Sequence, residues 1–190
     1  MTAGGQELIA RVQDGDANAF TGLVERYQPL VYRWSVGLVL DRDEADDVMQ
    51  EAFVIAYRKL GSFRGEGSIE GWLYRITRRV ATKHRRKKNR RAILGALPAA
   101  RPSREVYLTD PGARVDRERA LVLIHESVAE LPDRQREVFD LIDLQGYSPT
   151  EAGEFLALKP VSVRANLFKA RASIRRSILK THPRFSELQR

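Results

Sequence analysis

Residues 148–176 read SPTEAGEFLALKPVSVRANLFKARASIRR and predict two short helices joined by a tight turn. Ser148 is a favoured N-cap residue, Pro149 suits the first helical position, and Glu151 completes a capping box. The first helix must end before Pro160, because proline disfavours the α conformation of the residue that precedes it. Pro160 is itself well suited to begin the second helix, so the turn between the helices is only about three residues long.

The second of these helices has an apolar face and a cationic face. A helix of this kind is typical of a DNA-binding helix-turn-helix, in which cations contact phosphates and an Arg near the helix start reaches base edges. A helical hairpin with a solvated charged face is the alternative that this stretch alone leaves open. The apolar positions, which we expect to be buried, recur at helical spacing: Val163, Leu167, Ala170 and Ile174.

The composition is that of a globular and strongly basic chain. It has 190 residues, of which 43% are hydrophobic, and a formal net charge of +8. That length suffices for one large or two small domains. No apolar run approaches the roughly 20 residues that span a bilayer, and residues 1–10 lack the features of a secretory signal. We therefore expect a cytoplasmic protein with no membrane insertion of its own.

Metal and cofactor chemistry is not indicated. Cysteine is absent, and the three histidines are scattered, so each is interpreted as a solvated surface residue. The charge instead indicates a polyanionic partner. Residues 61–91 hold 11 Lys or Arg against two acids, and residues 159–190 hold nine against one, whereas each of these segments follows an acidic one. This alternation predicts two separate basic surfaces for nucleic acid and acidic surfaces for another partner.

The periodicity is helical almost everywhere, so we expect an all-α fold of two small helical domains joined by a flexible linker, the C-terminal one a helix-turn-helix. Asp16 should cap a helix that ends at Pro29, and a separate, largely buried helix should follow. A Gly-rich loop is expected before a helix that starts at Trp72 and runs into a basic cluster. The remaining expected segments are a short helix around residues 8–12, the buried helix at 30–40 and a helix at 43–60.

The second half of the chain begins after a change in composition. Residues 92–117 lose helical periodicity and gain prolines and glycines, as linkers do. About four helices should follow, the first of them with Leu121, Ile124, Val128 and Leu131 on one face. The predicted boundaries are a first domain at 1–91, the linker at 92–117, a second domain at 118–181 and a tail at 182–190.

Four blocks, in order, resemble the bacterial RNA polymerase sigma factors of the extracytoplasmic-function (ECF) class. They are Asp43 to Phe53 (DEADDVMQEAF), Gly71 to Ile76 (GWLYRI), Leu131 to Phe139 (LPDRQREVF) and Val163 to Arg171 (VRANLFKAR). The resemblance covers nearly the whole chain. It implies that the first domain is sigma region 2, the second is sigma region 4, and the protein is not an enzyme but a transcription initiation factor.

The acidic helix at 43–60 would bind the polymerase by this resemblance, through the clamp helices of its largest subunit. Like charges repeat there at four-residue spacing, which costs an isolated helix some stability and which a basic partner would relieve. A solvated acidic face with Asp43 as N-cap is the alternative, and no calcium-loop spacing is present. The expected polymerase-binding residues are Asp43, Glu44, Asp46, Asp47, Gln50 and Glu51.

The promoter −10 element would be melted by the loop and helix that follow. Opening a duplex requires a surface that holds unstacked bases and the single strand. Trp72 is also in phase with Ile76 and Val80, so a core position is the favoured interpretation of that residue. The expected −10 contacts are Phe63, Arg64, Ser68, Trp72, Tyr74, Arg75, Arg78, Arg79, Lys83 and Arg86.

The promoter −35 element would be contacted by the second helix of the helix-turn-helix. The exposed Phe168 suggests contact with a thymine methyl or a sugar edge. The turn departs from the family, because Ala152 and Gly153 replace the usual Ile-Ala pair and Ala157 replaces the turn Gly. We expect the turn to form nevertheless, with a slightly altered geometry. The expected −35 contacts are Ser162, Arg164, Ala165, Phe168, Lys169 and Arg171, with Ser162 and Arg171 assigned to phosphates.

The partners implied are core RNA polymerase, promoter DNA and an anti-sigma factor, with a monomer when the protein is unbound and no cofactor. Two other functions remain open from the residues alone. One is a stand-alone helix-turn-helix regulator, which would bind its DNA tightly without polymerase. The other is a metal-dependent nuclease using the acidic cluster, although no acid, base and nucleophile set is visible.

Overall fold

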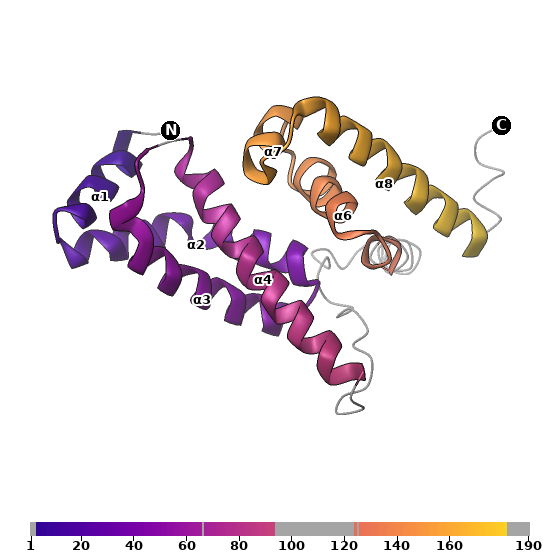
Figure 1. Cartoon of the computed structure of the whole chain (residues 1–190), viewed down its shortest axis with the longest axis horizontal. Helices are drawn as coiled ribbons and strands as arrows, with labels where there is room; N and C mark the ends of the chain where they lie inside the picture. Colours follow the sequence, from indigo (N-terminus) through magenta and orange to yellow (C-terminus); the bar gives the residue numbers. More distant parts are fainter. Residues whose placement is uncertain (1–2, 66, 94–123, 125, 182–190) are drawn as a thin grey trace, which may run out of the picture. The chain divides into compact units, whose positions relative to one another are not determined.

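The computed structural model describes residues 3–65, 67–93, 124 and 126–181, and every regular element in them is a helix. The chain divides into two compact units, Met1–Ala100 and Arg101–Arg190 (Figure 1). The predicted all-α class is confirmed. The predicted tail and most of the predicted linker lie outside the described residues; residues 92 and 93 are the last two of a helix.

The first unit is a bundle of four helices. They are α1 (Ala3–Gln13), α2 (Ala17–Val39), α3 (Arg42–Lys59) and α4 (Ile69–Ile93). The central helix α2 packs against the other three, and α3 also packs against α4 (Figure 1). Trp34 of α2 and Tyr74 of α4 are fully buried in the core and meet edge to face, with ring centroids 5.3 Å apart. Such aromatic pairs add to the stability gained from the buried area.

The helix α2 continues through Pro29, so the prediction of two separate helices there is wrong. Proline in a helix interior costs roughly 3 kcal/mol. However, Pro29 is exposed, and large buried side chains lie on both sides of it, including Tyr27 and Val31. Burying each such side chain contributes about 1.5 to 3 kcal/mol. One unbroken helix is therefore favoured, because it keeps the whole apolar face against the core.

The acidic helix α3 is capped by Asp41, whose carboxylate accepts from the amides of Asp43 and Glu44 at 3.1 and 3.2 Å. The alternative with Asp43 as N-cap is wrong, because Asp43 lies in the first helical turn. The helix ends at Lys59, and a 3₁₀ turn, η1 (Leu60–Ser62), follows. Leu60 is fully buried, so this turn is fixed to the core.

The basic helix α4 begins at Ile69, three residues before the predicted start at Trp72. The Ser68 hydroxyl accepts from the Gly71 amide at 3.0 Å and so satisfies one unpaired donor of the first turn. The preceding loop uses Gly65 and Gly67 at φ values of +74° and +81°, in the left-handed region that glycine adopts readily.

The second unit ends in the predicted helix-turn-helix. Residues 124 and 126–129 are helical, and α6 (Asp133–Phe139) continues into one π-helical segment, η2 (Asp140–Leu144). The helices α7 (Pro149–Leu156) and α8 (Pro160–Thr181) follow and pack together. The predicted buried stripe of α8 is confirmed, since its four residues lie in the core: Val163, Leu167, Ala170 and Ile174.

The turn between α7 and α8 forms despite the departures from the family. Both halves of the Ser148–Glu151 capping box are formed. Ala157 takes the left-handed conformation, at φ 53°, that the usual glycine would adopt. A Cβ on Gly153 would lie 2.7 Å from the carbonyl oxygen of Leu158. The glycine is therefore required at Gly153, where the turn passes close to α7.

Candidate polymerase and promoter interfaces

The outer face of α3 is a row of exposed acidic and polar side chains. Its buried positions, among them Ala45, Val48 and Ala52, fix the opposite face against the core. The carboxylates on the outer face form no ion pair with any residue that the structure describes. We call this set the acidic row: Asp43, Asp46, Asp47 and Gln50.

Two of the predicted polymerase-binding acids point instead toward α4. Glu51 accepts hydrogen bonds from Lys83 at 2.8 Å and pairs with His84 at 2.9 Å. Glu44 pairs with Lys88 at 2.7 Å, and Asp41 pairs with the same ammonium at 3.2 Å. These contacts, which we call the α3–α4 seam, hold the basic half of α4 against α3.

The electrostatics of the seam favour the charged forms of Glu51, Asp41 and Lys88. The hydrogen bond from Lys83, followed by that from His84, lowers the pKa of Glu51. Burial opposes ionisation of Asp41 and of Lys88, but the hydrogen bonds outweigh it, so the pKa of Asp41 is lowered and that of Lys88 is raised. The Lys83 side chain is 70% exposed, so it still faces solvent beside its partner.

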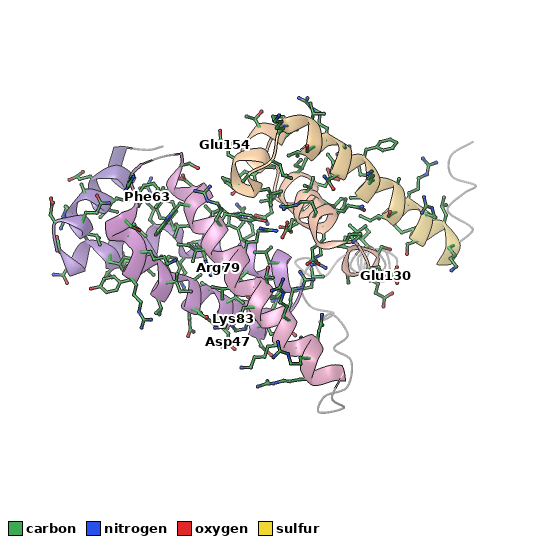
Figure 2. All side chains as sticks on the ribbon, viewed as in Figure 1. Asp47, Phe63, Arg79, Lys83, Glu130 and Glu154 are labelled. Atoms are coloured by element: carbon green, nitrogen blue, oxygen red, sulfur yellow. The ribbon has the colours of Figure 1, made fainter. Side chains whose placement is uncertain are left out.

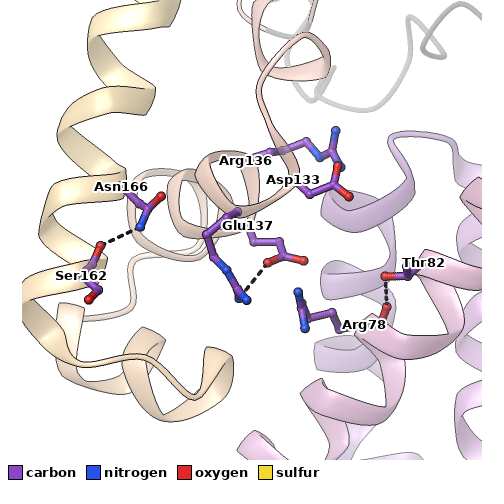
Figure 3. Close-up of polar contacts among 8 residues, drawn as sticks. Arg78, Thr82, Asp133, Arg136, Glu137, Ser162 and Asn166 are labelled. Carbon is purple, nitrogen blue, oxygen red and sulfur yellow. Dashed lines mark hydrogen bonds and ion pairs between the residues drawn. The ribbon is translucent and has the colours of Figure 1, made fainter.

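Most of the cations of α4 line an open groove along α3 and α4. Arg75, Arg79 and Arg86 are exposed, and Arg78 is partly buried (Figure 2 labels Arg79 and Lys83). The Arg78 carbonyl accepts from the Thr82 hydroxyl at 2.8 Å (Figure 3). The predicted −10 cations other than Arg64, which lies in the preceding loop, are thus brought to one helix. Further lining residues, which the prediction did not include, are Lys59, Lys87, Arg90 and Arg91.

A small pocket of about 170 Å³ lies where the loop meets the start of α4. Phe63 and Trp72 form its aromatic wall, with ring centroids 5.4 Å apart. Arg64 and Arg75 place two cations at its edge, and Ser62 completes the lining. Trp72 is only partly buried, so the favoured interpretation of Trp72 as a core residue is wrong.

The prediction that Tyr74 stacks on a base is also wrong, because Tyr74 is fully buried and its ring contacts that of Trp34. The core face of α4 runs through Leu73, Tyr74 and Val80 and not through Trp72 and Ile76. Ser68 likewise has a structural role, since its hydroxyl caps α4. Phe63 is itself buried, at 9% exposure, so of the three predicted aromatic contacts only Trp72 is not buried.

Gln13 was missed from the sequence and supports this pocket. Its side-chain amide donates to the carbonyl oxygens of Leu60 and Phe63, at 3.0 and 2.8 Å. These bonds tie the end of α1 to the loop that carries Phe63. No local pattern identifies such a residue, because its partners lie 47 and 50 positions away in the sequence.

The outer face of α8 presents the predicted −35 residues. Arg164, Ala165, Phe168 and Lys169 are all exposed, and Phe168 is 76% exposed. Ser162 is partly buried, and its carbonyl accepts from the Asn166 side chain at 2.8 Å (Figure 3). Arg171 is exposed but forms a two-bond ion pair with Asp143, so its guanidinium already has an anionic partner.

Comparisons with known proteins match both halves of the chain. Residues 23–91 match sigma-70 region 2, and residues 121–174 match sigma-70 region 4. The RNA polymerase sigma-H factor of Pseudomonas aeruginosa is 34% identical over 91% of this chain and 93% of its own length. The ECF RNA polymerase sigma-E factor of Haemophilus influenzae is 33% identical over 91% of this chain and 94% of its own.

The chain belongs to the ECF family of RNA polymerase sigma factors. It is therefore a transcription initiation factor and not an enzyme: it binds core RNA polymerase and directs it to promoter DNA. Membership of this family excludes the stand-alone regulator and the nuclease considered above.

Two solved structures share the fold of this sigma factor. One is CnrH in complex with the cytosolic domain of CnrY, with a TM-score of 0.66 and 24% identity over 94% of this chain and 99% of that chain. The other is the sigma factor RpoE in complex with the anti-sigma factor NepR from Bartonella quintana. Its TM-score is 0.63, and it is 20% identical over 84% of this chain and 96% of that chain.

The family match to region 2 begins at residue 23, so α1 and its Gln13 lie outside it. The part of this sigma factor that the structure describes contains no helix long and apolar enough to cross a membrane. Within the same residues, no group of three or more His, Cys, Asp or Glu side chains is placed to hold a metal ion.

Proposed function

We propose that the acidic row of α3 binds the basic or polar surface of the clamp helices in the largest polymerase subunit. The observation that carries this proposal is the row of exposed carboxylates at Asp43, Asp46 and Asp47 without cationic partners in the described residues. Carboxylates at this spacing repel one another, and a cationic partner removes that repulsion. Glu44 and Glu51 support the interface indirectly, by holding α4.

The second proposed role is capture of the melted −10 strand by α4. Aromatic side chains stack on unpaired bases, and cations beside them hold the backbone. Phe63 and Trp72 provide the aromatic wall, and Arg64 and Arg75 lie at the edge of the same pocket. The exposed Arg79 and Arg86 extend the cationic surface along the helix. A single unpaired base in this pocket would keep the strands apart.

The third proposed role is recognition of the −35 duplex by α8. A recognition helix places its N-terminal residues against base edges. Arg164 lies in the second turn and is exposed, so its guanidinium can donate to the acceptors of a guanine. Arg171 lies farther along the helix and is assigned to a phosphate, a contact that sets the affinity but not the sequence preference.

The proposed setting is the cytoplasm, where core polymerase and the chromosome are, with a monomer when the sigma factor is unbound. By resemblance to the class, an anti-sigma factor holds it inactive. That partner would cover the acidic row, because occluding it prevents binding to polymerase. The basic groove of α4 offers a second surface for an acidic inhibitor segment.

Runoff transcription with purified core polymerase on a genomic library tests this function. The full chain should produce transcripts that core polymerase alone does not, and their start sites should share upstream elements. Core binding measured at low ionic strength accompanies this experiment. If the chain does not bind core polymerase there, the proposed interfaces are wrong.

A further inference from the structure

The basic groove along α3 and α4 contains a carboxylate. Nine of the thirteen described residues that line the groove are Lys or Arg, and Glu51 is the only acid among these thirteen. Glu51 reaches the groove from α3, whereas most of the cations belong to α4. A carboxylate repels the phosphates that the cations attract. Glu51 therefore weakens the groove as a binding site for a single strand.

Glu51 presents its two carboxylate oxygens to α4 as a phosphate of DNA would. Oε1 accepts from the Nζ ammonium of Lys83 at 2.8 Å, and Oε2 lies 2.9 Å from Nε2 of His84. Phosphates bind side chains in a similar way, by offering paired acceptor oxygens at such distances. Two side chains of α4 are thus occupied by an anionic group of the chain itself.

The contacts of Glu51 with α4 are open to solvent. The side chain of Lys83 is 70% exposed, that of Glu51 is 32% exposed and that of His84 is 24% exposed. Ion pairs with this much access to water contribute little to stability, and salt weakens them further. The buried residues Leu73 and Val80 hold α4 against the core independently of these contacts. Another ion can therefore replace Glu51 without unfolding the first unit.

Glu51 also lies beside the acidic row of α3. It follows Asp47 by four residues, and side chains at this spacing are neighbours on a helix surface. A cation that binds Asp47 is therefore near Glu51 as well and competes with Lys83 for its carboxylate. In this way one carboxylate belongs to two surfaces, the proposed polymerase interface and the basic groove.

We propose that Glu51 occupies Lys83 and His84 in the unbound sigma factor, and that core polymerase releases them by drawing Glu51 to its own cations. The inference rests on the polymerase and −10 interfaces proposed above. It distinguishes two states. In the first state Glu51 contacts α4; in the second it contacts polymerase, and Lys83 contacts a phosphate of the melted strand. The two binding events are then coupled, so each partner strengthens the binding of the other by the same factor.

Glu51→Gln tests the inference, because it removes the negative charge and keeps the size of the side chain. The wild-type holoenzyme first selects a −10 element from a randomised library. A fluorescent single strand carrying that element is then titrated with the full chain alone and with holoenzyme at saturating core polymerase. Melting temperatures verify that each variant is folded.

The expected result differs between the unbound sigma factor and the holoenzyme. Without polymerase, Glu51→Gln should bind the strand about threefold to fivefold more tightly than the wild type. The slope of log affinity against log salt concentration should become steeper by about 0.7, which corresponds to one additional phosphate contact on a single strand. In the holoenzyme the two proteins should bind the strand with similar affinity, because polymerase has already drawn Glu51 away from Lys83.

Three further variants separate the release of Lys83 from other effects of the substitution. Glu25→Gln, on the exposed side of α2, makes the same change of net charge outside the groove and should leave strand affinity unchanged. Glu44→Gln loosens the α3–α4 seam at Lys88 without removing the carboxylate from the groove, so its gain should be smaller. In Lys83→Met, adding Glu51→Gln should give little further gain, because the cation that it releases is missing.

Each contrary result has a distinct meaning. Equal strand affinity of the unbound wild type and Glu51→Gln contradicts the occupation of Lys83 by Glu51 and leaves the proposed function intact. An equal gain in the holoenzyme contradicts the release by polymerase. A gain in Glu44→Gln as large as that in Glu51→Gln assigns the effect to a looser seam and overturns the inference. A wild-type holoenzyme that selects no promoter contradicts the proposed function itself.

Discussion

The guanidinium of Arg171 donates two hydrogen bonds to the carboxylate of Asp143, from Nη2 at 2.6 Å and from Nε at 2.9 Å. The pair joins α8 to η2, at a position that was assigned to a DNA phosphate. A carboxylate beside a DNA-binding helix competes with phosphate for the cation and repels the DNA. Asp143 is therefore expected to limit the affinity of this helix for DNA.

Removing Asp143 should strengthen DNA binding, and removing Arg171 should weaken it. In Asp143→Asn, Arg171 becomes available to a phosphate, so the affinity for all promoter sequences should rise. The slope of log affinity against log salt concentration should become steeper by about one, which corresponds to one additional phosphate contact. Arg171→Ala should lower affinity for all sequences alike. Titrations of the holoenzyme at several salt concentrations measure both. Equal salt slopes for the three proteins would contradict the phosphate assignment.

Charge reversal should separate the acidic row from the α3–α4 seam. Asp47→Lys should lower core polymerase affinity by tenfold or more without changing the melting temperature, because the Asp47 side chain is exposed and has no ion pair among the described residues. Glu51→Lys should lower the melting temperature, because it replaces the carboxylate that pairs with Lys83 and His84 by a second cation. Glu25→Lys, on the exposed side of α2, is the matched control and should change neither.

Truncation of two neighbouring aromatic residues should have different consequences. Tyr74→Ala leaves a cavity in the core and should cost about 3 to 5 kcal/mol of unfolding free energy. Trp72→Ala should cost less, because Trp72 is partly exposed, but should reduce promoter opening. Thermal or denaturant unfolding measures the first effect, and the fluorescence of 2-aminopurine in the −10 element measures the second. A normal opening signal in Trp72→Ala would remove Trp72 from the interface.

Loss of Gln13 should impair promoter opening without affecting polymerase binding. Its side-chain amide holds the carbonyls of Leu60 and Phe63, and each such bond contributes about 0.5 to 1.5 kcal/mol. Gln13→Ala should therefore loosen the loop, and Gln13→Glu should do the same because a carboxylate cannot donate to a carbonyl. The exposed neighbour provides the control, Asp14→Ala. Slower opening with unchanged core affinity is the expected result; unchanged opening would contradict the positioning role.

The stability of the first unit should depend on acidic pH through Asp41 and Glu51. Their pKa values in the folded chain lie below the ordinary 3.8 and 4.5. A lowered pKa contributes stability that is complete above the ordinary value and is lost as pH falls through the folded value. The melting temperature should therefore begin to fall as the pH drops below 4.5 and should continue to fall below 3.8. The double variant Asp41→Asn with Glu51→Gln should melt lower at pH 6 and show a weaker decline; an identical decline would contradict this origin.

The local signals in the sequence determined the helix-turn-helix almost completely. The Ser148 and Glu151 capping box, the break before Pro160 and the buried stripe of α8 all depend on residues within one or two helical turns of each other. Such interactions form wherever the local chain forms, so the sequence alone specifies them. The four family blocks likewise specified the class, because their order and spacing are properties of the sequence.

Only the tertiary structure decided the roles that depend on distant neighbours. Buried side chains on both sides of Pro29 keep α2 continuous through this proline. The orientation of α4 about its axis buries Tyr74 and leaves Trp72 beside the loop that carries Phe63. Gln13 and Glu51 acquired their partners from elements 47 and 32 positions away. Helical periodicity identifies the apolar face of a helix, but it does not identify the residues that this face contacts. The position of each side chain in the interfaces therefore followed from how the helices pack.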